Sequence, residues 1–253
     1  MAGLTRAQVI ECFHLAFLNA LPSHVRRENY VVKGGANLRY FYRSHRYSED
    51  IDFDAVLGEG WKLTEQVDAA LGGAGLKAQL RRYDIQVAHI NAAKQTDTTR
   101  RWKLLLSASG HVDPISTKVE FSSRNGDTRF DTETADEHVT RSYGLIRPIL
   151  QRYRAPAAAE QKIDALALRN ETQARDVFDL DWLFGNYRSA IEAGPLDPGR
   201  AEQAATNCLA LTYDAYVGQV VPFLELDIAE IYGSEAAWNQ MQTRVFEELM
   251  RLQ

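Results

Sequence analysis

The sequence predicts an α+β fold, with a mixed sheet and flanking helices in the N-terminal half and a mostly helical C-terminal half. Three observations predict it. Short stretches with strand character lie before about residue 122, helical periodicity dominates from residue 155 onward, and Pro148 marks the change between them. We therefore expect two domains, residues 1–150 and residues 151–253.

Local patterns predict the elements of the N-terminal half. Thr5 followed by Gln8 is typical of a capping box, and apolar residues at helical spacing then predict a helix to about Leu21. The run Tyr30-Val31-Val32 predicts a strand, and alternating acidic and apolar residues predict another over 48–56. The remaining expected elements are helices at 37–42 and 61–71 and strands at 85–90, 102–107 and 117–122.

The C-terminal half contains four stretches with helical character. They cover residues 155–169, 175–187, 201–217 and 236–252. We expect these helices to pack together as the second domain.

Composition excludes several classes of protein. Of 253 residues, 45% are hydrophobic and 25% are charged, which excludes collagen, low-complexity disorder and a coiled-coil rod. The two cysteines, Cys12 and Cys208, are far apart and have no Cys or His cluster nearby, so we expect a reduced compartment and no structural zinc. No apolar run approaches the ~20 residues that cross a bilayer. The sequence therefore predicts a cytoplasmic protein with no membrane partner.

Basic residues are concentrated in the N-terminal half, although the net charge of the chain is −5. Residues 77–103 carry seven basic and two acidic side chains, and residues 141–154 carry four arginines and no acid. Arg39, Arg43 and Arg46 follow helical spacing and predict a basic helical stripe. A solvated surface is the ordinary explanation of such runs. The uneven distribution of charge along the chain also fits an N-terminal half that binds phosphates.

Two acids in the predicted strand at 48–56 are the first candidates for chemistry. Successive side chains of a strand point to opposite faces, so Asp50 and Asp52 share one face while Ile51 and Phe53 enter the core. Carboxylates at this spacing suit Mg²⁺, which takes one or two of them and completes its shell with water and phosphate oxygens. Such a pair is common by chance, so the neighbouring motifs decide whether it is a metal site.

Those surroundings include a glycine pair and a third acid. Lys33-Gly34-Gly35 follows a strand and precedes a helix, where backbone N–H groups can approach a phosphate, although a glycine pair is more often a simple turn. Glu120 alternates in the strand at 117–122 and could join the acid pair for two-metal phosphoryl transfer. On spacing alone, Glu120 is more simply a solvent-facing strand residue.

The order of these motifs resembles that of the AbiEii-type nucleotidyltransferase toxins of the DNA polymerase β-like superfamily. Residues 33–38 (KGGANL) and 46–53 (RYSEDIDF) resemble the family's KGGTAL and SEDIDF signatures. Residues 118–122, 160–166 and 175–180 continue the resemblance, which covers about residues 30–187.

The resemblance implies a nucleotidyltransferase fold, an NTP substrate, Mg²⁺ as cofactor and a cognate antitoxin as partner. It also implies transfer of nucleotides to the 3′ end of tRNA, which blocks translation. Together, the residue patterns and the resemblance give Asp50, Asp52, Glu120, Lys162 and Asp176 as the expected catalytic residues, with the acids Asp50, Asp52 and Glu120 as metal ligands. The expected nucleotide-binding residues are Lys33, Gly34, Gly35, Ser48 and Lys162. The helical domain is expected to contribute Lys162 and Asp176 to the active-site cleft.

The chain departs from the family pattern at two positions. Ala36 stands where the family has Ser or Thr, so a hydroxyl contact to phosphate would have to come from Asn37 or Ser48. Gln161 replaces the acid before Lys162 but leaves the cation, which could neutralise a triphosphate. Asp176 has an alternative explanation as a helix-surface ion pair with Arg175 or a neighbouring turn.

Three functions from different classes therefore stay open. The first is a metal-dependent nucleotidyltransferase toxin that acts on RNA. The second is a nucleotidyltransferase that modifies a small molecule or a protein hydroxyl, because a fold does not fix the acceptor. The third is a catalytically silent module that binds a partner, against which the intact Asp50, Asp52 and Lys162 argue.

Overall fold

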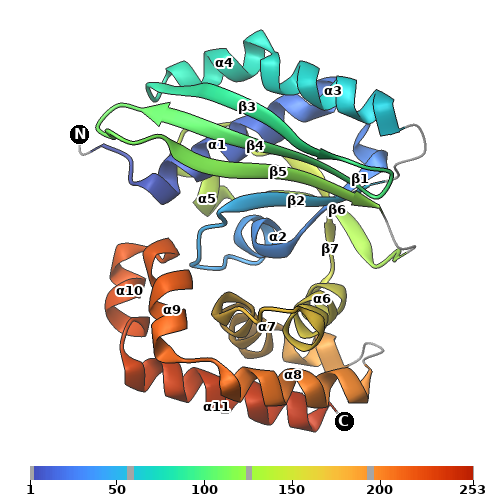
Figure 1. The fold of residues 1–253 in the computed structure, drawn as a ribbon, viewed down its shortest axis with the longest axis vertical. Coiled ribbons are helices and arrows are strands. Elements are labelled where there is room, and N and C mark those ends of the chain that lie inside the picture. Colours follow the sequence, from blue (N-terminus) through green and yellow to red (C-terminus); the bar gives the residue numbers. More distant parts are fainter. Residues whose placement is uncertain (1–2, 56–59, 124–126, 193–196, 253) are drawn as a thin grey trace. The chain divides into compact units, whose positions relative to one another are not determined.

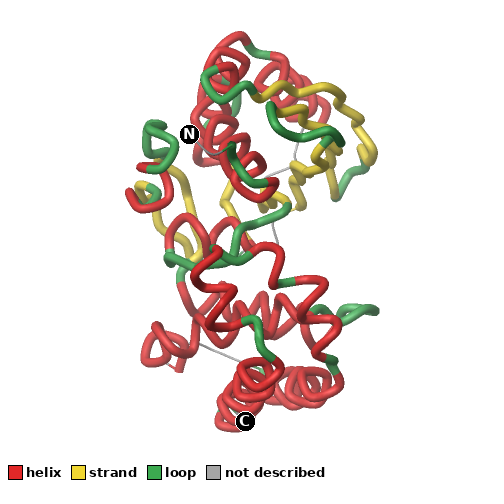
Figure 2. The backbone as a smooth tube through the Cα atoms, turned by 90° about the vertical axis from the view of Figure 1, so that its left-hand side faces the viewer, coloured by secondary structure: helices red, strands yellow, loops and turns green. Residues whose placement is uncertain are grey.

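The computed structural model describes residues 3–55, 60–123, 127–192 and 197–252. The chain forms two compact units. Unit 1 comprises residues 1–43 and 47–152, and unit 2 comprises residues 44–46 and 153–253. The chain therefore passes between the units three times, because the short segment Ser44–Arg46 belongs to the C-terminal unit. Strands occur in unit 1, whereas the described part of unit 2 is helical (Figure 2).

Unit 1 is built on a seven-stranded mixed sheet with the order β3-β4-β5-β2-β1-β7-β6 (Figure 1). Its strands are β1 Tyr30–Lys33, β2 Asp50–Ala55, β3 Ile85–Gln95, β4 Thr99–Ala108, β5 Ile115–Ser123, β6 Phe130–Thr134 and β7 Ile149–Tyr153. β2 runs parallel to β5 and antiparallel to β1, and β3, β4 and β5 pair antiparallel in chain order. The parallel β2–β5 contact brings together two segments that are about 70 residues apart in the sequence.

Helices cover one face of this sheet. Those of unit 1 are α1 Arg6–Ala20, α2 Gly34–Phe41, α3 Gly60–Gly72, α4 Ala74–Arg81 and α5 Glu137–Arg141, and the short 3₁₀ helices are η1 Leu21–Ser23 and η2 Arg27–Asn29. Buried residues of α1, α3 and α4 form one apolar cluster with the inward residues of β2, β4 and β5, such as Phe53, Trp102 and Phe121. The opposite residues of these strands, including Asp50 and Asp52, therefore point away from that core.

Unit 2 is an assembly of helices. They are α6 Ala155–Leu168, α7 Ala174–Glu192, α8 Pro198–Ala210, α9 Tyr213–Gln219, η3 Val221–Phe223, α10 Leu226–Tyr232 and α11 Glu235–Arg251. α6 packs against α7 and α8, and α11 packs against α7 and α8. No helix in the described part of the chain is long and apolar enough to cross a membrane.

The α+β fold class is confirmed, with a mixed sheet followed by a helical C-terminal half. The capping box of α1 forms as expected from Thr5 and Gln8. The predicted strand at 48–56 is β2 at 50–55, and Val56 lies outside the described residues. The single helix expected at 201–217 is wrong, because the chain leaves α8 at Leu211 and the Thr212 side chain caps a new helix.

Several elements carry weak local signals and were not predicted. They are α4, α5, α10 and the strands β6 and β7. β7 pairs with β1 through Val32 and Arg152, about 120 residues apart, so its formation depends on the tertiary structure.

Candidate active site

Three of the predicted site acids come together on the exposed face of the unit 1 sheet. Asp50, Ile51, Asp52 and Phe53 alternate between half-buried and buried positions, so both aspartates leave the sheet on the same side. Asp52 is aligned with Glu120 in the parallel β2–β5 pair. The structure therefore places Glu120 beside the acid pair, which spacing alone did not decide.

The glycine turn lies beside the same acids. Gly34 begins α2 with φ +66°, a left-handed conformation that favours glycine. A Cβ added to Gly34 would lie 3.6 Å from Asp52 Oδ2, so the backbone of the turn closely approaches this carboxylate. Within unit 1, the glycine turn thus lies beside the acidic strand, as expected.

A lysine lies among the three carboxylates. Lys118 Nζ is 3.1 Å from Asp50 Oδ2, 3.7 Å from Asp52 Oδ1 and 3.7 Å from Glu120 Oε2. Lys118 is aligned with Asp50 across the β2–β5 pair and lies two residues before Glu120, so all four side chains share one face.

Two further cations flank this group. Arg101 donates from Nε to Glu120 Oε2 over 2.5 Å. Lys33, which was assigned to the nucleotide, donates from Nζ to Asp54 Oδ1 over 2.5 Å. On this face, the acids of β2 therefore lie between Lys33 of β1 and Lys118 of β5, and Glu120 of β5 lies next to Arg101 of β4.

Burial and the neighbouring charges shift the pKa values of Asp52, Glu120 and Lys118 in opposite directions. Burial raises the pKa of Asp52, the nearby Asp50 and Glu120 add to the rise, and Lys118 opposes it. Burial also acts to raise the pKa of Glu120, but the hydrogen bond from Arg101 and the charge of Lys118 outweigh it and lower the pKa. For Lys118, burial acts to lower the pKa, whereas the three carboxylates prevail and raise it.

The donor set of this site fits a hard cation. Asp50, Asp52 and Glu120 offer carboxylate oxygens, the ligands that Mg²⁺ prefers, and they already surround one positive charge. As they are arranged in the described ranges, however, no three His, Cys, Asp or Glu side chains converge in a way that could hold a metal ion directly. The Lys118 ammonium stands as the cation of the group.

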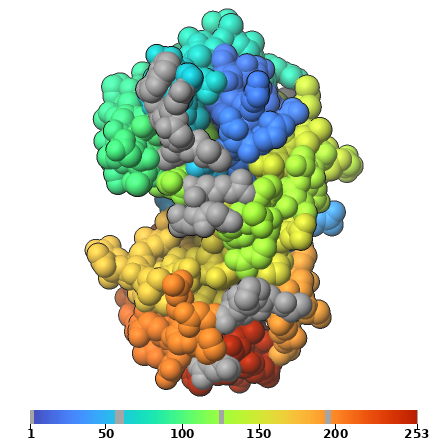
Figure 3. Space-filling model, turned by 90° about the vertical axis from the view of Figure 1, so that its right-hand side faces the viewer, coloured from blue at the N-terminus to red at the C-terminus, as the bar shows by residue number. Residues whose placement is uncertain are grey.

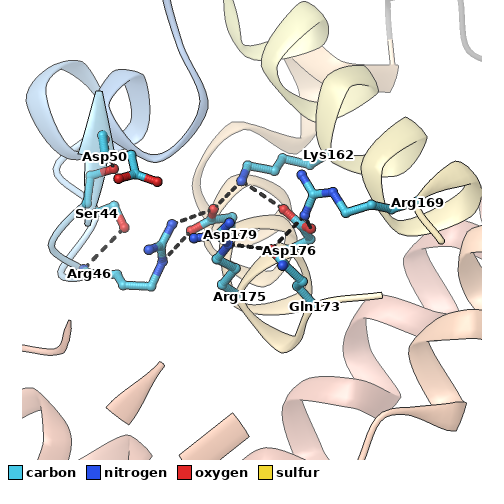
Figure 4. A network of polar contacts seen from close by, with 10 residues as sticks. Ser44, Arg46, Asp50, Lys162, Arg169, Gln173, Arg175, Asp176 and Asp179 are labelled. Carbon is cyan, nitrogen blue, oxygen red and sulfur yellow. Dashed lines mark hydrogen bonds and ion pairs between the residues drawn. The ribbon is translucent and has the colours of Figure 1, made fainter. Parts of the chain in front are cut away.

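Lys162 and Asp176 form a second charged cluster, within unit 2. Lys162 Nζ donates to Asp176 Oδ1 over 2.9 Å and lies 2.6 Å from Asp179 Oδ2 (Figure 4). Arg169 pairs with the other oxygen of Asp176 at 2.7 Å. Asp176 is fully buried, so its alternative explanation as an ion pair on the helix surface is wrong, although it does pair with Arg169 at the end of the preceding helix α6.

Arg46 joins the same cluster from the segment Ser44–Arg46. It donates from Nε to Asp179 Oδ1 over 3.0 Å and from Nη2 to Asp179 Oδ2 over 2.8 Å, the two-pronged geometry of a strong Arg–carboxylate pair. Although burial acts to raise the pKa of Asp179, Arg46 and Lys162 lower it to about 2. Figure 4 shows Lys162 and Arg46 approaching the Asp179 carboxylate from different directions.

Ser48, the candidate replacement for the family's hydroxyl, makes a local contact. Its Oγ donates to the backbone oxygen of Asp50 over 2.7 Å, and the residue is 8% exposed. This hydrogen bond fixes the chain directly before the acid pair. In this arrangement the hydroxyl proton is committed to the backbone.

The predicted basic surface is corrected by the structure. The stripe of Arg39, Arg43 and Arg46 is wrong, because α2 ends at Phe41, Arg39 is buried against Glu11, and Arg46 belongs to unit 2. The stretch 77–103 is divided as well. Arg81 and Arg82 lie at the end of α4, whose Leu76 and Leu80 join the covered core, and Arg100 is 8% exposed.

Arg101 and Lys103 do lie on the face of the acids. They alternate in β4 and are aligned with Glu120 and Lys118 respectively. The end of the β3–β4 hairpin, coloured green, stands at the surface of unit 1 in Figure 3. Within residues 141–154, Arg141 pairs with Glu137 and Arg152 pairs with Glu133, so these charges are balanced locally.

Several residues of the two clusters were not predicted, although signals for them exist. Lys118 alternates with Glu120 and therefore had to share its face. Asp179 follows Asp176 by three residues, the spacing of neighbours on one helix face. Nothing local indicates that Arg46 reaches Asp179, because the pair spans 133 residues.

Comparison with known proteins identifies the family. Residues 16–251 match the family described as "Nucleotidyl transferase AbiEii toxin, Type IV TA system". The chain belongs to the AbiEii family. Membership makes it a nucleotidyltransferase-family protein of a type IV toxin–antitoxin system, which implies a nucleotide substrate and an antitoxin partner. No curated protein sequence matches the chain.

Two solved structures share the fold of this AbiEii protein. JHP933 from Helicobacter pylori is 18% identical with a TM-score of 0.60, and the match covers 99% of this chain and 96% of that one. A second H. pylori structure, described as a candidate nucleotidyltransferase, is 18% identical with a TM-score of 0.55 and covers 95% of each chain. At this identity the likeness concerns the fold.

Proposed function

We propose that this AbiEii protein transfers nucleotides from an NTP to the 3′ end of a tRNA and so blocks translation. The observation that carries the proposal is the grouping of Asp50, Asp52 and Glu120 on one sheet face beside the glycine turn. Transfer to a nucleic-acid 3′ hydroxyl is what the family resemblance implies for the acceptor.

The residues of this face have distinct proposed roles. A divalent ion such as Mg²⁺, when held by Asp50, Asp52 and Glu120, would neutralise developing charge on the phosphates and activate the attacking hydroxyl. The turn at Gly34 and Gly35 offers backbone N–H groups at the start of α2, where the helix dipole favours an anion such as a phosphate. Lys33 and Ser48 are proposed to position the acids and the turn through their bonds to Asp54 and to the Asp50 backbone.

Lys162 and Asp176 are proposed to act as a pair. The Lys162 ammonium is held by two buried carboxylates, so it is positioned as a fixed cation that can balance a triphosphate. Replacing Lys162 with Ala is expected to weaken NTP binding by a few kcal/mol at most. The same change is expected to destabilise unit 2, because Asp176 and Asp179 lose a buried partner.

A second acceptor class has an observation in its favour. Within the basic stretch 77–103, Arg81, Arg82 and Arg100 lie away from the face that carries the acids, and Arg101 is bound to Glu120. Among the described residues, these arginines therefore form no continuous basic surface beside the acids, which argues against a long RNA contact. A small molecule or a protein hydroxyl is the alternative acceptor.

One experiment separates these acceptors. Purified protein is incubated with Mg²⁺ and each α-labelled NTP in turn, with total RNA in one reaction and with RNase-treated lysate in a parallel one. Label in an RNA band of tRNA size supports the proposal. Label in protein or in small molecules supports the alternative, and no label with any NTP contradicts nucleotidyl transfer.

A further inference from the structure

Lys118 differs from the other cations of the site in its position. Its ammonium lies within 4 Å of three carboxylates from two strands, and its side chain is 25% exposed. By contrast, Arg101 is paired with Glu120, and Lys33 is paired with Asp54, which is not one of the three acids. Lys118 thus occupies the centre of the oxygen ligands.

We propose that Lys118 is an internal counter-ion that holds the three acids together without metal and must be displaced when a divalent ion binds. This inference rests on the proposed metal site at Asp50, Asp52 and Glu120. Three carboxylates in one small group repel each other strongly, and a positive charge among them relieves this repulsion. An ammonium and a divalent ion compete for the same oxygens, so both do not fit at the centre together.

The competition has two consequences. The first is that Lys118 weakens metal binding, because the metal has to break three charge contacts before it coordinates. The second is that Lys118 stabilises the metal-free protein. A lysine on a flexible stem is suited to this exchange, since it can swing out toward solvent without moving the strand.

The test compares Lys118→Met with Lys103→Met. Lys103 is aligned with Lys118 on β4, lies on the same face and is exposed, so its replacement removes the same charge without touching the group. Binding of Mn²⁺ alone is measured by calorimetry and by the loss of the free-ion spin resonance signal. We expect Lys118→Met to tighten Mn²⁺ binding by about tenfold or more, ~1.4 kcal/mol, and Lys103→Met to change it less than about twofold.

A second measurement uses the unmodified protein and does not depend on the folding of any variant. Acylation of lysines by a water-soluble ester is followed by peptide mass spectrometry with and without Mn²⁺. We expect the ion to raise labelling of Lys118 several-fold and to leave Lys103 unchanged. Unchanged labelling of Lys118, or Mn²⁺ binding that is equal or weaker in Lys118→Met, overturns the inference.

Failure of the inference is distinguishable from failure of the proposed function. If neither the unmodified protein nor Lys118→Met binds Mn²⁺, the metal site and the inference both fall. If Lys118→Met binds Mn²⁺ more tightly but no acceptor is labelled by any NTP, the counter-ion role stands and the proposed reaction falls. Equal binding together with labelled RNA leaves the reaction standing without the counter-ion.

Discussion

At the scale of single residues, the charged groups of this protein differ most in how deeply they are buried. Asp50 and Asp52 have side chains that are 27% and 31% exposed, whereas that of Asp179 is fully buried. A half-exposed acid contributes little to packing and can exchange its cation. A buried acid is fixed by its partners and contributes mainly to stability.

We expect Asp50→Ala and Asp52→Ala to abolish nucleotide transfer while the fold stays intact. Loss of a metal ligand should cost about a hundredfold or more, since even outer partners of a metal site typically cost 10–100-fold. The change in unfolding free energy should stay below about 1 kcal/mol, because the side chains are partly exposed.

Transfer is measured with labelled NTP and the acceptor found above, and folding is measured by circular dichroism. Asp97→Asn serves as the control, because Asp97 is an exposed acid in the turn between β3 and β4. Wild-type transfer rates in either alanine variant would remove the argument for a metal site at these residues.

Asp179 makes the stability of unit 2 depend on pH. Its pKa of about 2 in the folded protein lies below the ordinary value of an aspartate, because Arg46 and Lys162 overcome the effect of burial. The unfolded chain therefore takes up the proton first. The contribution to stability is complete above about pH 4 and is lost as the pH falls toward 2.

Urea unfolding at pH values from 6 to 2 checks this dependence. The unfolding free energies of the wild type and of Asp179→Asn are compared at each pH. Their difference should stay constant between pH 6 and about pH 4 and shrink below it. A difference that stays constant down to pH 2 would argue against the paired, ionised Asp179.

At the scale of elements, two short connections decide where the functional side chains lie. The glycine turn before α2 brings the backbone to Asp52, and the segment between α2 and β2 carries Arg46 to α7. The first connection contacts the acidic strand β2, and the second leads directly into it.

Gly34→Ala should destabilise the protein by about 1–2 kcal/mol, because an L-residue disfavours the left-handed backbone found there. The added Cβ itself meets only an ordinary contact at 3.6 Å from Asp52 Oδ2. Gly75→Ala is the matched control, since Gly75 lies within α4 in open space and should gain up to about 1 kcal/mol. Thermal and urea unfolding measure both, and a shift of the same sign for the two variants would contradict the expectation.

Arg46→Met should destabilise unit 2 by about 3–5 kcal/mol, because it leaves the buried Asp179 with one cation in place of two. Arg244→Met offers a control with the same geometry. Arg244 donates from Nε and Nη2 to both oxygens of Asp181, but its side chain is 51% exposed. That pair should contribute about 1 kcal/mol or less. Similar losses in unfolding free energy for both variants would show that burial is not the deciding factor.

At the scale of the whole molecule, the chain is divided into two units with separate interiors. In the described part of the chain, the apolar cluster around Cys12 contains no residue beyond Leu150. Cys208 is buried in unit 2, and neither thiol is in a disulfide. The expected domains of residues 1–150 and 151–253 remain a proposal, which has to include the passage of Ser44–Arg46 into unit 2.

The two thiols allow the units to be followed separately. Burial raises the pKa of both thiols to about 12, so neither should react with a thiol reagent in the native protein. Cys208→Ala then reports unit 1 through Cys12, and Cys12→Ala reports unit 2 through Cys208. We expect different urea midpoints for the two, because each thiol lies in its own core. Coincident midpoints would mean that the chain unfolds as a single cooperative unit.

The sequence by itself determined the fold class, the family and the face of the acid pair. Alternation in β2 places Asp50 and Asp52 together because strand periodicity is a local property. Local signals also predicted most helices, but they missed the break at Leu211, where a polar cap interrupts an otherwise helical pattern.

Only the tertiary structure decided which cations meet these acids. The register of β2 against β5 puts Glu120 beside Asp52 and Lys118 beside Asp50, and Arg46 finds Asp179 across 133 residues. These contacts depend on strand register and burial between distant segments, for which short stretches of sequence carry no signal. Burial between distant segments is also the reason why the predicted basic surface is wrong. The charge distribution of the sequence suggested that Arg39 and Arg100 lie on the surface, but both are buried in the folded protein.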